Sequence, residues 1–320
     1  MSTERLRALL LPAAAPVLWG AALVAGRVVS ADLPPITITW IRFVLVSLVL
    51  LPMLKFREGR LPRPRRGETV ALLLLAITGV VLFNLFLFSG LQTVTAVRSS
   101  VILALSPSVV ALALMVLFGE RAGWNAALGI AVAFVGVIVT ITDGRPALVL
   151  AGGVSIGDLY LLGSVLSWSA YTIIARYAIR NLSSQAVLSY SSIMGAVLLT
   201  PIALRGDIVA ELAAAPPVVW AALLYLIVGA AGIGYFMYYE GIREVGPNRA
   251  AVFLNLEPIS AILLGVVLLG EGLSTPVLLG AGLVICGLYL VNRPAGRNAK
   301  GRNAKGRNAK GRNANPSEAL

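Results

Sequence analysis

The feature that most constrains this chain is a series of long apolar stretches separated by short polar loops. A helix needs about 20 apolar residues to cross the hydrocarbon core of a bilayer. By that rule the sequence predicts an all-α membrane protein with ten transmembrane helices. They cover approximately residues 9–29, 36–54, 69–91, 95–118, 125–141, 157–178, 185–204, 218–240, 250–269 and 277–291.

Composition narrows the function classes. Of the 320 residues, 58% are hydrophobic and 12% are charged, whereas soluble domains carry about a quarter charged residues. The chain has no histidine, Cys286 is its single cysteine, and none of its lysines precedes Ser or Thr. These absences argue against a histidine-dependent hydrolase, a zinc enzyme and an ATPase with a Walker phosphate loop. We therefore expect no enzymatic activity, no metal and no cofactor.

Positive charge is distributed unequally between alternate loops. If both termini are cytoplasmic, the cytoplasmic segments hold 21 of the 26 Lys and Arg residues and the opposite loops hold 4. This is the positive-inside pattern, which predicts that both termini face the cytoplasm. The first apolar segment also has features of a cleaved signal peptide. Its pairing with the sixth segment in an internal repeat argues against cleavage.

The chain contains an internal repeat. A shift of 151 residues aligns the third to fifth segments with the eighth to tenth without a gap, and a shift of 149 aligns the first two with the sixth and seventh. Apolar residues align easily by chance, but the aligned residues also include Trp, Arg, Glu, Pro and Gly, which do not. They include Trp19/Trp168, Arg27/Arg176, Pro52/Pro201, Gly90/Gly241, Arg98/Arg249, Pro107/Pro258, Glu120/Glu271, Gly129/Gly280 and Gly136/Gly287. Since each half has five segments, the second half enters the membrane from the opposite side, as in transporters that alternate access around a midplane site.

Four stretches resemble a known family. WGAALVAGRVVSADLPPITITWIRF, ILALSPSVVALALMVLFGERAGWNAALGIAVAFVGVIV, GDLYLLGSVLSWSAYTIIARYAI and NLEPISAILLGVVLLGE resemble the EamA halves of the drug/metabolite transporter superfamily. The resemblance covers residues 9–292 and is greatest to the bacterial aromatic amino acid exporter branch. It implies ten helices in a basket around a central cavity, with the fifth and tenth peripheral. It also implies export of small metabolites across a bacterial cytoplasmic (inner) membrane.

The repeat also predicts the organisation of the chain. Residues 1–148 form the first five-helix EamA repeat, residues 149–292 form the second, and residues 293–320 form a basic cytoplasmic tail. The tail repeats Gly-Arg-Asn-Ala-Lys and has too few apolar residues to form a core, so we expect it to be disordered. It lacks the interleaved aromatic residues that nucleic-acid binding favours. Its alternatives are a solvated tail that fixes topology or a segment that contacts anionic lipid headgroups.

Polar and aromatic residues inside the segments are candidates for the wall of a substrate cavity, because such groups in lipid usually face protein or water. Aromatic walls with a few polar groups suit amphipathic organic solutes. The candidates are Trp19, Asn84, Phe88, Trp168, Tyr171, Tyr235, Tyr239, Asn255 and Glu257. For each aromatic residue the alternative is ordinary core packing. For Glu257 the alternative is a structural or gating role.

A second set of residues is expected to act in gating. Pro107 and Pro258 lie at matching positions in the fourth and ninth segments, where proline removes a backbone hydrogen bond. Their alternative is a static kink. Arg98 and Arg249 begin the same two segments. They either clasp a gate or anchor the helix ends at the interface.

The glycines of the fifth and tenth segments give each helix a smooth face. We expect this face to pack within one chain, in a monomer, with a homodimer contact as the alternative.

These observations predict a secondary exporter of amino acids, particularly aromatic and other neutral ones, whose partners are its solute and the lipid bilayer. The first alternative is the same fold acting on a drug cation, a purine or a sugar derivative. The second is a membrane scaffold that does not transport.

Overall fold

The structure of the protein is a computed structural model that describes residues 3–120, 123–145, 147, 153–178, 182–246, 250 and 253–292. Arg249 and the basic tail from residue 293 lie outside these described residues. The side chains of Tyr235 and Tyr239 also lie outside them, although both belong to a described helix.

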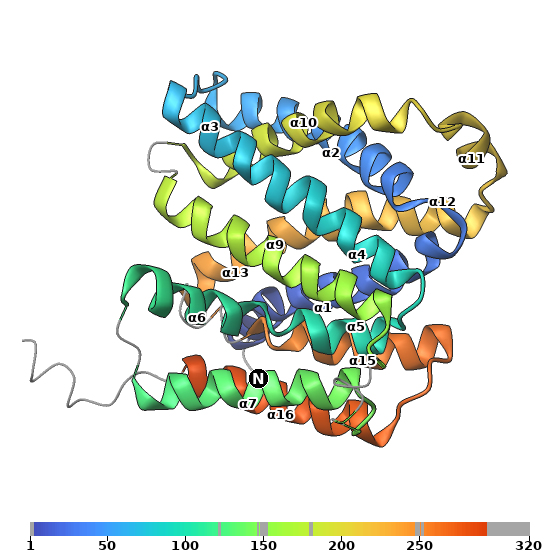
Figure 1. Ribbon diagram of the computed structural model, residues 1–320. Helices are drawn as coiled ribbons and strands as arrows, with labels where there is room; N and C mark the ends of the chain where they lie inside the picture. The colour runs from blue at the N-terminus through green and yellow to red at the C-terminus, as the bar shows by residue number, and fades with distance from the viewer. Residues whose placement is uncertain are drawn as a thin grey trace, which may run out of the picture.

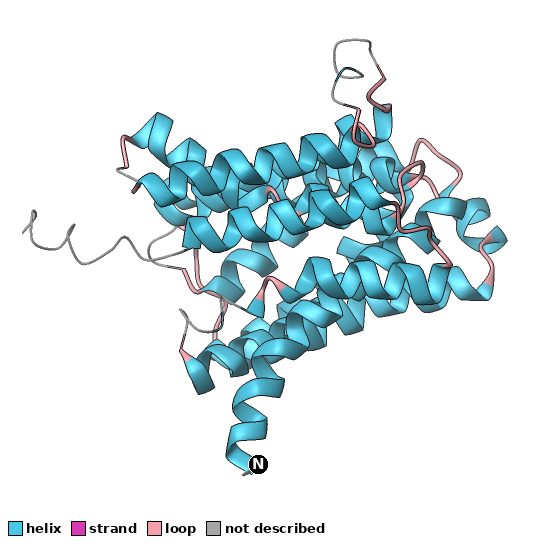
Figure 2. Cartoon of the chain, turned by 90° about the horizontal axis from the view of Figure 1, so that it is seen from below, coloured by secondary structure: helices cyan, strands magenta, loops and turns pink. Residues whose placement is uncertain are grey.

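Helices make up the described chain, and no strand occurs within it (Figure 2). The first half contains α1 (Thr3–Asp32), α2 (Pro35–Glu58), α3 (Arg66–Leu75), η1 (Ala76–Leu82), α4 (Phe83–Leu91), α5 (Ala96–Leu103), α6 (Ser106–Phe118) and α7 (Trp124–Ile141). The second contains α9 (Ile156–Ala178), α10 (Ser184–Ala203), α11 (Ile208–Ala214), α12 (Pro217–Leu224), η2 (Tyr225–Gly234), α13 (Tyr235–Val245), α15 (Leu256–Leu269) and α16 (Thr275–Asn292). The long helices lie side by side in a bundle, with α11 at one of its ends (Figure 1).

Eight helices in the described ranges are long and apolar enough to cross a membrane. Three of them combine shorter elements, namely α3–η1–α4, α5–α6 and α12–η2–α13. The sixth and ninth predicted segments are helical but do not belong to the eight. Helix α9 carries Asp158 and three serines, and the described part of the ninth segment, α15, has only 14 residues. The multi-pass membrane fold is thus established, and the count of ten spans stays a prediction.

The two glycine-bearing helices, α7 and α16, pack directly against each other. A Cβ added at Gly129 would lie 2.6 Å from the carbonyl oxygen of Gly287, and one added at Gly136 would lie 2.7 Å from that of Gly280. Contacts that advance along α7 while receding along α16 make the pair antiparallel. The smooth faces are therefore occupied within one chain, and oligomeric state stays a prediction.

Helices α2 and α10, the second helices of the two halves, also run antiparallel. Trp40 Nε1 near the start of α2 donates to Thr200 Oγ1 near the end of α10 at 3.0 Å. Farther along α2, the Leu50 carbonyl accepts from Ser189 Oγ at 3.4 Å. Equivalent helices of the two halves thus point in opposite directions at both of these pairs.

The first helix of each half packs against the third and fourth segments of the other half. Helix α1 contacts η2, α13 and α15, and α9 contacts η1, α4, α5 and α6. Matching residues make matching contacts. A Cβ at Gly90 would lie 2.6 Å from the side chain of Leu161, and one at Gly241 would lie 2.8 Å from the Cα of Pro12. The shifts of 151 and 149 residues relate one contact to the other.

Each half contains a π-helical segment, η1 or η2, that the apolar pattern did not predict. A shift of 151 residues places η1 within η2. π-Helical turns inside α-helices are rare and often occur at functional sites. Their presence at equivalent positions indicates that both halves depend on the same local irregularity.

The proline positions in the fourth and ninth segments begin new helices. Helix α5 ends at Leu103, two turn residues follow, and Pro107 lies in the first turn of α6. Pro258 lies in the first turn of α15, again after two turn residues. Proline is tolerated there because the first backbone N–H groups of a helix have no intrahelical acceptor. The predicted kink at Pro107 is therefore a break between α5 and α6, and Pro258 follows a turn at the start of α15. A gating role for either position stays a prediction.

The α7–α16 contact predicts a difference between two glycines of the same helix. Gly287→Ala places a Cβ 2.6 Å from the carbonyl oxygen of Gly129, whereas a Cβ at Gly282 meets no atom within 4 Å. We expect Gly287→Ala to lower the free energy of unfolding by ~1–3 kcal/mol, as overpacking generally does. Gly282→Ala should leave it unchanged. Thermal unfolding in detergent checks this, and equal melting temperatures for the two variants would contradict the contact.

Candidate functional site

Two aromatic clusters occupy equivalent places in the two halves. In the first, the ring of Trp168 on α9 lies 5.0 Å from Phe83 and 5.0 Å from Tyr171, centroid to centroid. Tyr171 also lies against Gly79 of η1, where a Cβ would overlap its ring. A single glycine therefore lets the ring of Tyr171 approach the π-helical segment closely.

In the second cluster, Trp19 of α1 lies against η2. Its Nε1 donates to the carbonyl of Ala230 at 3.1 Å, and its ring lies 5.3 Å from that of Tyr238. The hydroxyl of Tyr225 donates to the Leu18 carbonyl at 2.8 Å. Both repeated tryptophans therefore contact the π-helical region of the opposite half.

Asn84 is buried beside η1, and its side-chain amide is hydrogen-bonded to backbone carbonyls of η1. Its Nδ2 donates to the carbonyls of Gly79 at 3.2 Å and Val80 at 2.9 Å, while its Oδ1 accepts from Arg42 at 3.0 Å. A π-helical turn changes the backbone hydrogen-bonding register, and carbonyls without partners are costly in hydrocarbon. Ala230, which accepts from Trp19, is the equivalent of Gly79 in the repeat. Both π-helical segments thus have a carbonyl at the same position bonded by a side chain.

The remaining predicted cavity residues are dispersed. Phe88 is 1% exposed and packs in the main apolar core, next to Gly26. Asn255 precedes α15, and Glu257 lies in its first turn, where its backbone carbonyl accepts from Ser260 Oγ at 2.9 Å. Phe88 therefore packs in the apolar core, and a role for it in a cavity wall stays a prediction.

Arg98 is held in an ion-pair network between α5, the end of α7 and the start of α9. Its Nε and Nη2 donate to the carboxylate of Asp158 at 2.9 and 2.7 Å. Nη2 also donates to the Ile141 carbonyl at 2.6 Å, and Nη1 lies 3.3 Å from Asp143. Asp158 is fully buried and accepts from Ser155 Oγ at 2.7 Å. Arg98 thus fastens three helices at one end of the bundle, whereas its repeat partner Arg249 lies outside the described residues.

Glu271, one of the repeated acidic residues, stabilises the N-terminus of α5 at the same end. Its two carboxylate oxygens each accept a backbone N–H, from Ala96 and Val97, at 2.8 Å. A carboxylate is favourable there because of the unpaired amides and the positive end of the helix dipole. The matching Glu120 pairs with Arg176 at 2.9 Å. Sequence analysis aligned both glutamates but assigned them no role.

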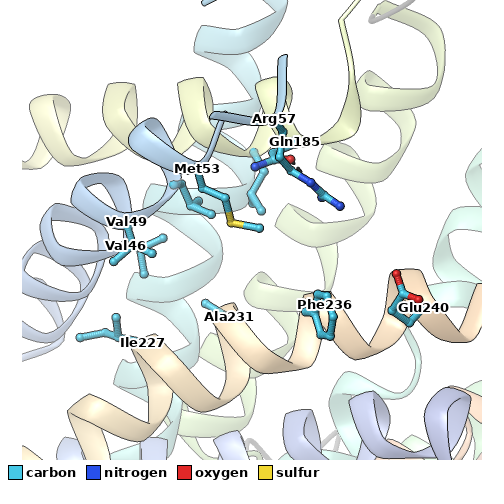
Figure 3. Close-up of a pocket in the computed structure, with 12 residues that line it drawn as sticks. Val46, Val49, Met53, Arg57, Gln185, Ile227, Ala231, Phe236 and Glu240 are labelled. Atoms are coloured by element: carbon cyan, nitrogen blue, oxygen red, sulfur yellow. Dashed lines mark hydrogen bonds between the residues drawn. The ribbon is translucent and has the colours of Figure 1, made fainter. Parts of the chain in front are cut away.

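Pockets in the described part of the chain include two that are lined by charged residues. The first, named here the Arg57 groove, lies between α2, α10 and η2–α13 (Figure 3). The second, named here the Arg98 pocket, lies beside the Arg98 network, near the starts of α5 and α9. The Arg57 groove is lined by residues including Val46, Leu50, Met53, Arg57, Gln185, Ile227, Phe236 and Glu240, and the Arg98 pocket by residues including Thr95, Arg98, Asp143, Ser155 and Ser274.

Of the predicted cavity residues whose side chains the structure describes, none lines either pocket, and Arg98 is the one described gating residue that does. The Arg98 pocket has a volume of about 410 Å³ and the Arg57 groove about 70 Å³. Small-molecule sites usually have volumes of ~300–1,000 Å³. The Arg57 groove must therefore widen before it can enclose a solute.

The chain matches the EamA-like transporter family twice, over residues 6–142 and 155–293. It belongs to this family. Because the family is one of transporters and eight described helices can span a bilayer, this EamA protein is a membrane transporter.

Similar proteins support the same assignment. The uncharacterized transporter YyaM of Bacillus subtilis (strain 168) is 28% identical over 255 residues, covering 80% of this chain and 83% of YyaM. The WAT1-related protein At3g02690, chloroplastic, of Arabidopsis thaliana is 25% identical over 88% of this chain and 68% of its own. A solved crystal structure with 19% identity has a TM-score of 0.57 and covers 91% of this chain and 98% of its own, which supports the fold alone.

The Arg98 network predicts unequal effects for its two acidic partners. Asp158 is fully buried, whereas the side chain of Asp143 is 60% exposed. Asp158→Asn should lower the free energy of unfolding by ~3–5 kcal/mol, because it breaks a buried ion pair and leaves Arg98 without its main partner. Asp143→Asn should lower the free energy of unfolding by less than ~1 kcal/mol, as expected for a solvent-screened ion pair. Thermal unfolding in detergent compares them, and an equal loss would refute the unequal roles.

Proposed function

We propose that this transporter is a secondary exporter of neutral amino acids, particularly aromatic ones, and of related small metabolites. It works by alternating access in the cytoplasmic membrane, with both termini in the cytoplasm. The two halves, residues 1–148 and 149–292, are inverted copies of one five-helix unit. The membrane-transporter part of this assignment rests on the family, and the solute and mechanism are the proposal.

The observation that carries the proposal is the reciprocal packing of the two halves. Antiparallel α7–α16 and α2–α10 pairs, and the packing of α1 and α9 on opposite π-helical segments, support a two-fold relation between the halves. Two inverted copies of one unit have two arrangements of similar energy, because each copy can adopt the conformation of the other. This is the physical basis of alternating access in inverted-repeat transporters.

The aromatic clusters support an amphipathic solute. Trp168, which stacks on Tyr171, lies near the middle of α9, and Trp19, which contacts Tyr238, lies near the middle of α1. Aromatic rings of this kind bind apolar side chains, and nearby polar groups orient the solute. The sequence has no Walker motif, so the proposed energy source is the solute gradient or a coupled ion.

Proteoliposomes preloaded with labelled phenylalanine test this function. We expect wild-type vesicles to release the label faster than protein-free vesicles. Trp168→Ala should slow release roughly 2- to 12-fold, since an aromatic contact contributes ~0.5–1.5 kcal/mol. Trp124→Ala is the matched control, because Trp124 is 80% exposed at the start of α7.

Glu257→Gln should also slow release, with exposed Glu244→Gln as its control. A competition panel that contains other amino acids, a drug cation, a purine and a sugar derivative ranks the solutes. Wild-type vesicles that retain every solute as well as protein-free vesicles do would exclude transport. Inhibition by one of the other solutes but by no amino acid would replace the proposed solute class.

A further inference from the structure

The Arg57 groove has an apolar floor and a polar rim. Val46, Leu50 and Met53 form a stripe along one face of α2, and Ile227 and Phe236 line the facing wall (Figure 3). From Val46 to Arg57 the stripe is ~16 Å long at the rise of an α-helix. The polar residues lie at the end of α2 that is predicted to face the cytoplasm. The groove is therefore amphipathic along its length.

The rim carries opposite charges on opposite walls. Arg57 and Gln185 lie on one wall, and Glu240 lies on the other (Figure 3). Arg57 donates to Oε1 of Gln185 at 3.3 Å, which orients the amide. Arg243 donates to Oε1 of Glu240 at 2.7 Å, which orients the carboxylate.

The amide nitrogen of Gln185 is a hydrogen-bond donor that no described residue uses. Nε2 is buried and has no acceptor among the described residues. A buried donor without an acceptor costs ~1–3 kcal/mol. The nitrogen lies beside the Arg57 guanidinium, so the two together present donors to an anionic group.

We propose that the Arg57 groove is the cytoplasmic port of the transporter, where a zwitterionic solute with an apolar side chain first binds. The solute carboxylate accepts from Arg57 and from Gln185 Nε2. Its ammonium group pairs with Glu240, and its side chain lies along the stripe of α2. This inference rests on the proposed amino acid export and adds the residues that select the zwitterion.

The equivalent place in the other half is closely packed. The repeat relates Val46 to Gly195 and Ala231 to Val80, and a Cβ added at Gly195 would overlap the side chain of Val80. Helix α10 therefore approaches η1 as closely as a glycine permits, whereas the matching helices α2 and η2 line a groove. In an inverted-repeat transporter, such a difference between equivalent sites corresponds to one port that is closed and one that is narrow but can widen to admit the solute.

Charge-deleted solutes test the proposed recognition. In proteoliposomes, Arg57→Gln should raise the KM for phenylalanine about tenfold, because the solute carboxylate loses one hydrogen bond to a charged group. It should leave inhibition by phenethylamine, which lacks the carboxylate, unchanged. Glu240→Gln should raise the KM similarly and leave inhibition by 3-phenylpropionate unchanged. Arg60→Gln is the matched control, because Arg60 is an exposed arginine outside the groove.

A binding assay separates this proposal from the transport function. Met53→Cys in a Cys286→Ser background places one thiol in the groove, and phenylalanine should slow its reaction with a maleimide. Leu48→Cys, on the exposed face of α2, should react at an unchanged rate. Protection without transport would support the binding site and contradict the exporter function.

The other outcomes overturn the proposal. Transport by wild type with no protection, or with Arg57→Gln equal to Arg60→Gln, would refute the port and leave export intact. Protection by phospholipid but by no amino acid would assign the groove to a lipid. Absence of both transport and protection would refute both proposals.

Discussion

The structure depends on the rule that no backbone polar group can be left unpaired inside a bilayer. The fold departs from regular α-helix at the π-helical segments and at the helix breaks before Pro107 and Pro258. Buried side chains bond carbonyls at these places, as Asn84 and Trp19 do in the π-helical segments. Residues that the sequence suggests for solute binding are thus partly engaged in stabilising irregular backbone. Irregular backbone at membrane depth is tolerated only where protein or a cavity surrounds it. Side chains that bond such backbone therefore lie in the same places where side chains for solute binding are expected.

The two ends of the bundle are stabilised differently. At one end Arg98 and Asp158 join three helices, and Glu271 stabilises the start of α5. At the other end the groove between α2 and α13 has an apolar floor and charged residues at its rim. The repeat aligns Asp158 with Leu9, so the acidic partner of this ion pair is not repeated in the sequence. The asymmetry is therefore present in the sequence, although the two halves share one architecture.

Much of the fold could be predicted from the sequence, because membrane-spanning helices are recognised by the length and hydropathy of their apolar segments. The paired glycines also indicated close helix packing, and the structure places Gly129 against Gly287. The π-helical segments were not predictable, since a local change of hydrogen-bonding register leaves no mark in an almost uniformly apolar stretch. The partners of Asn84 and Trp19 depend on that register, so their roles were missed. The central cavity was placed by analogy and stays a prediction. Among the described side chains, Asn84 and Trp19 bond backbone carbonyls and Phe88 packs in the core.

The glycine contact between α7 and α16 has a mechanical consequence. Backbone lies on backbone at Gly129/Gly287 and at Gly136/Gly280, about two helical turns apart. Two such points fix a line, and neither helix can slide along it without driving a carbonyl into its neighbour. The close contact therefore resists sliding of α7 along α16, and movement along this line is opposed by backbone rather than by side chains that could change rotamer.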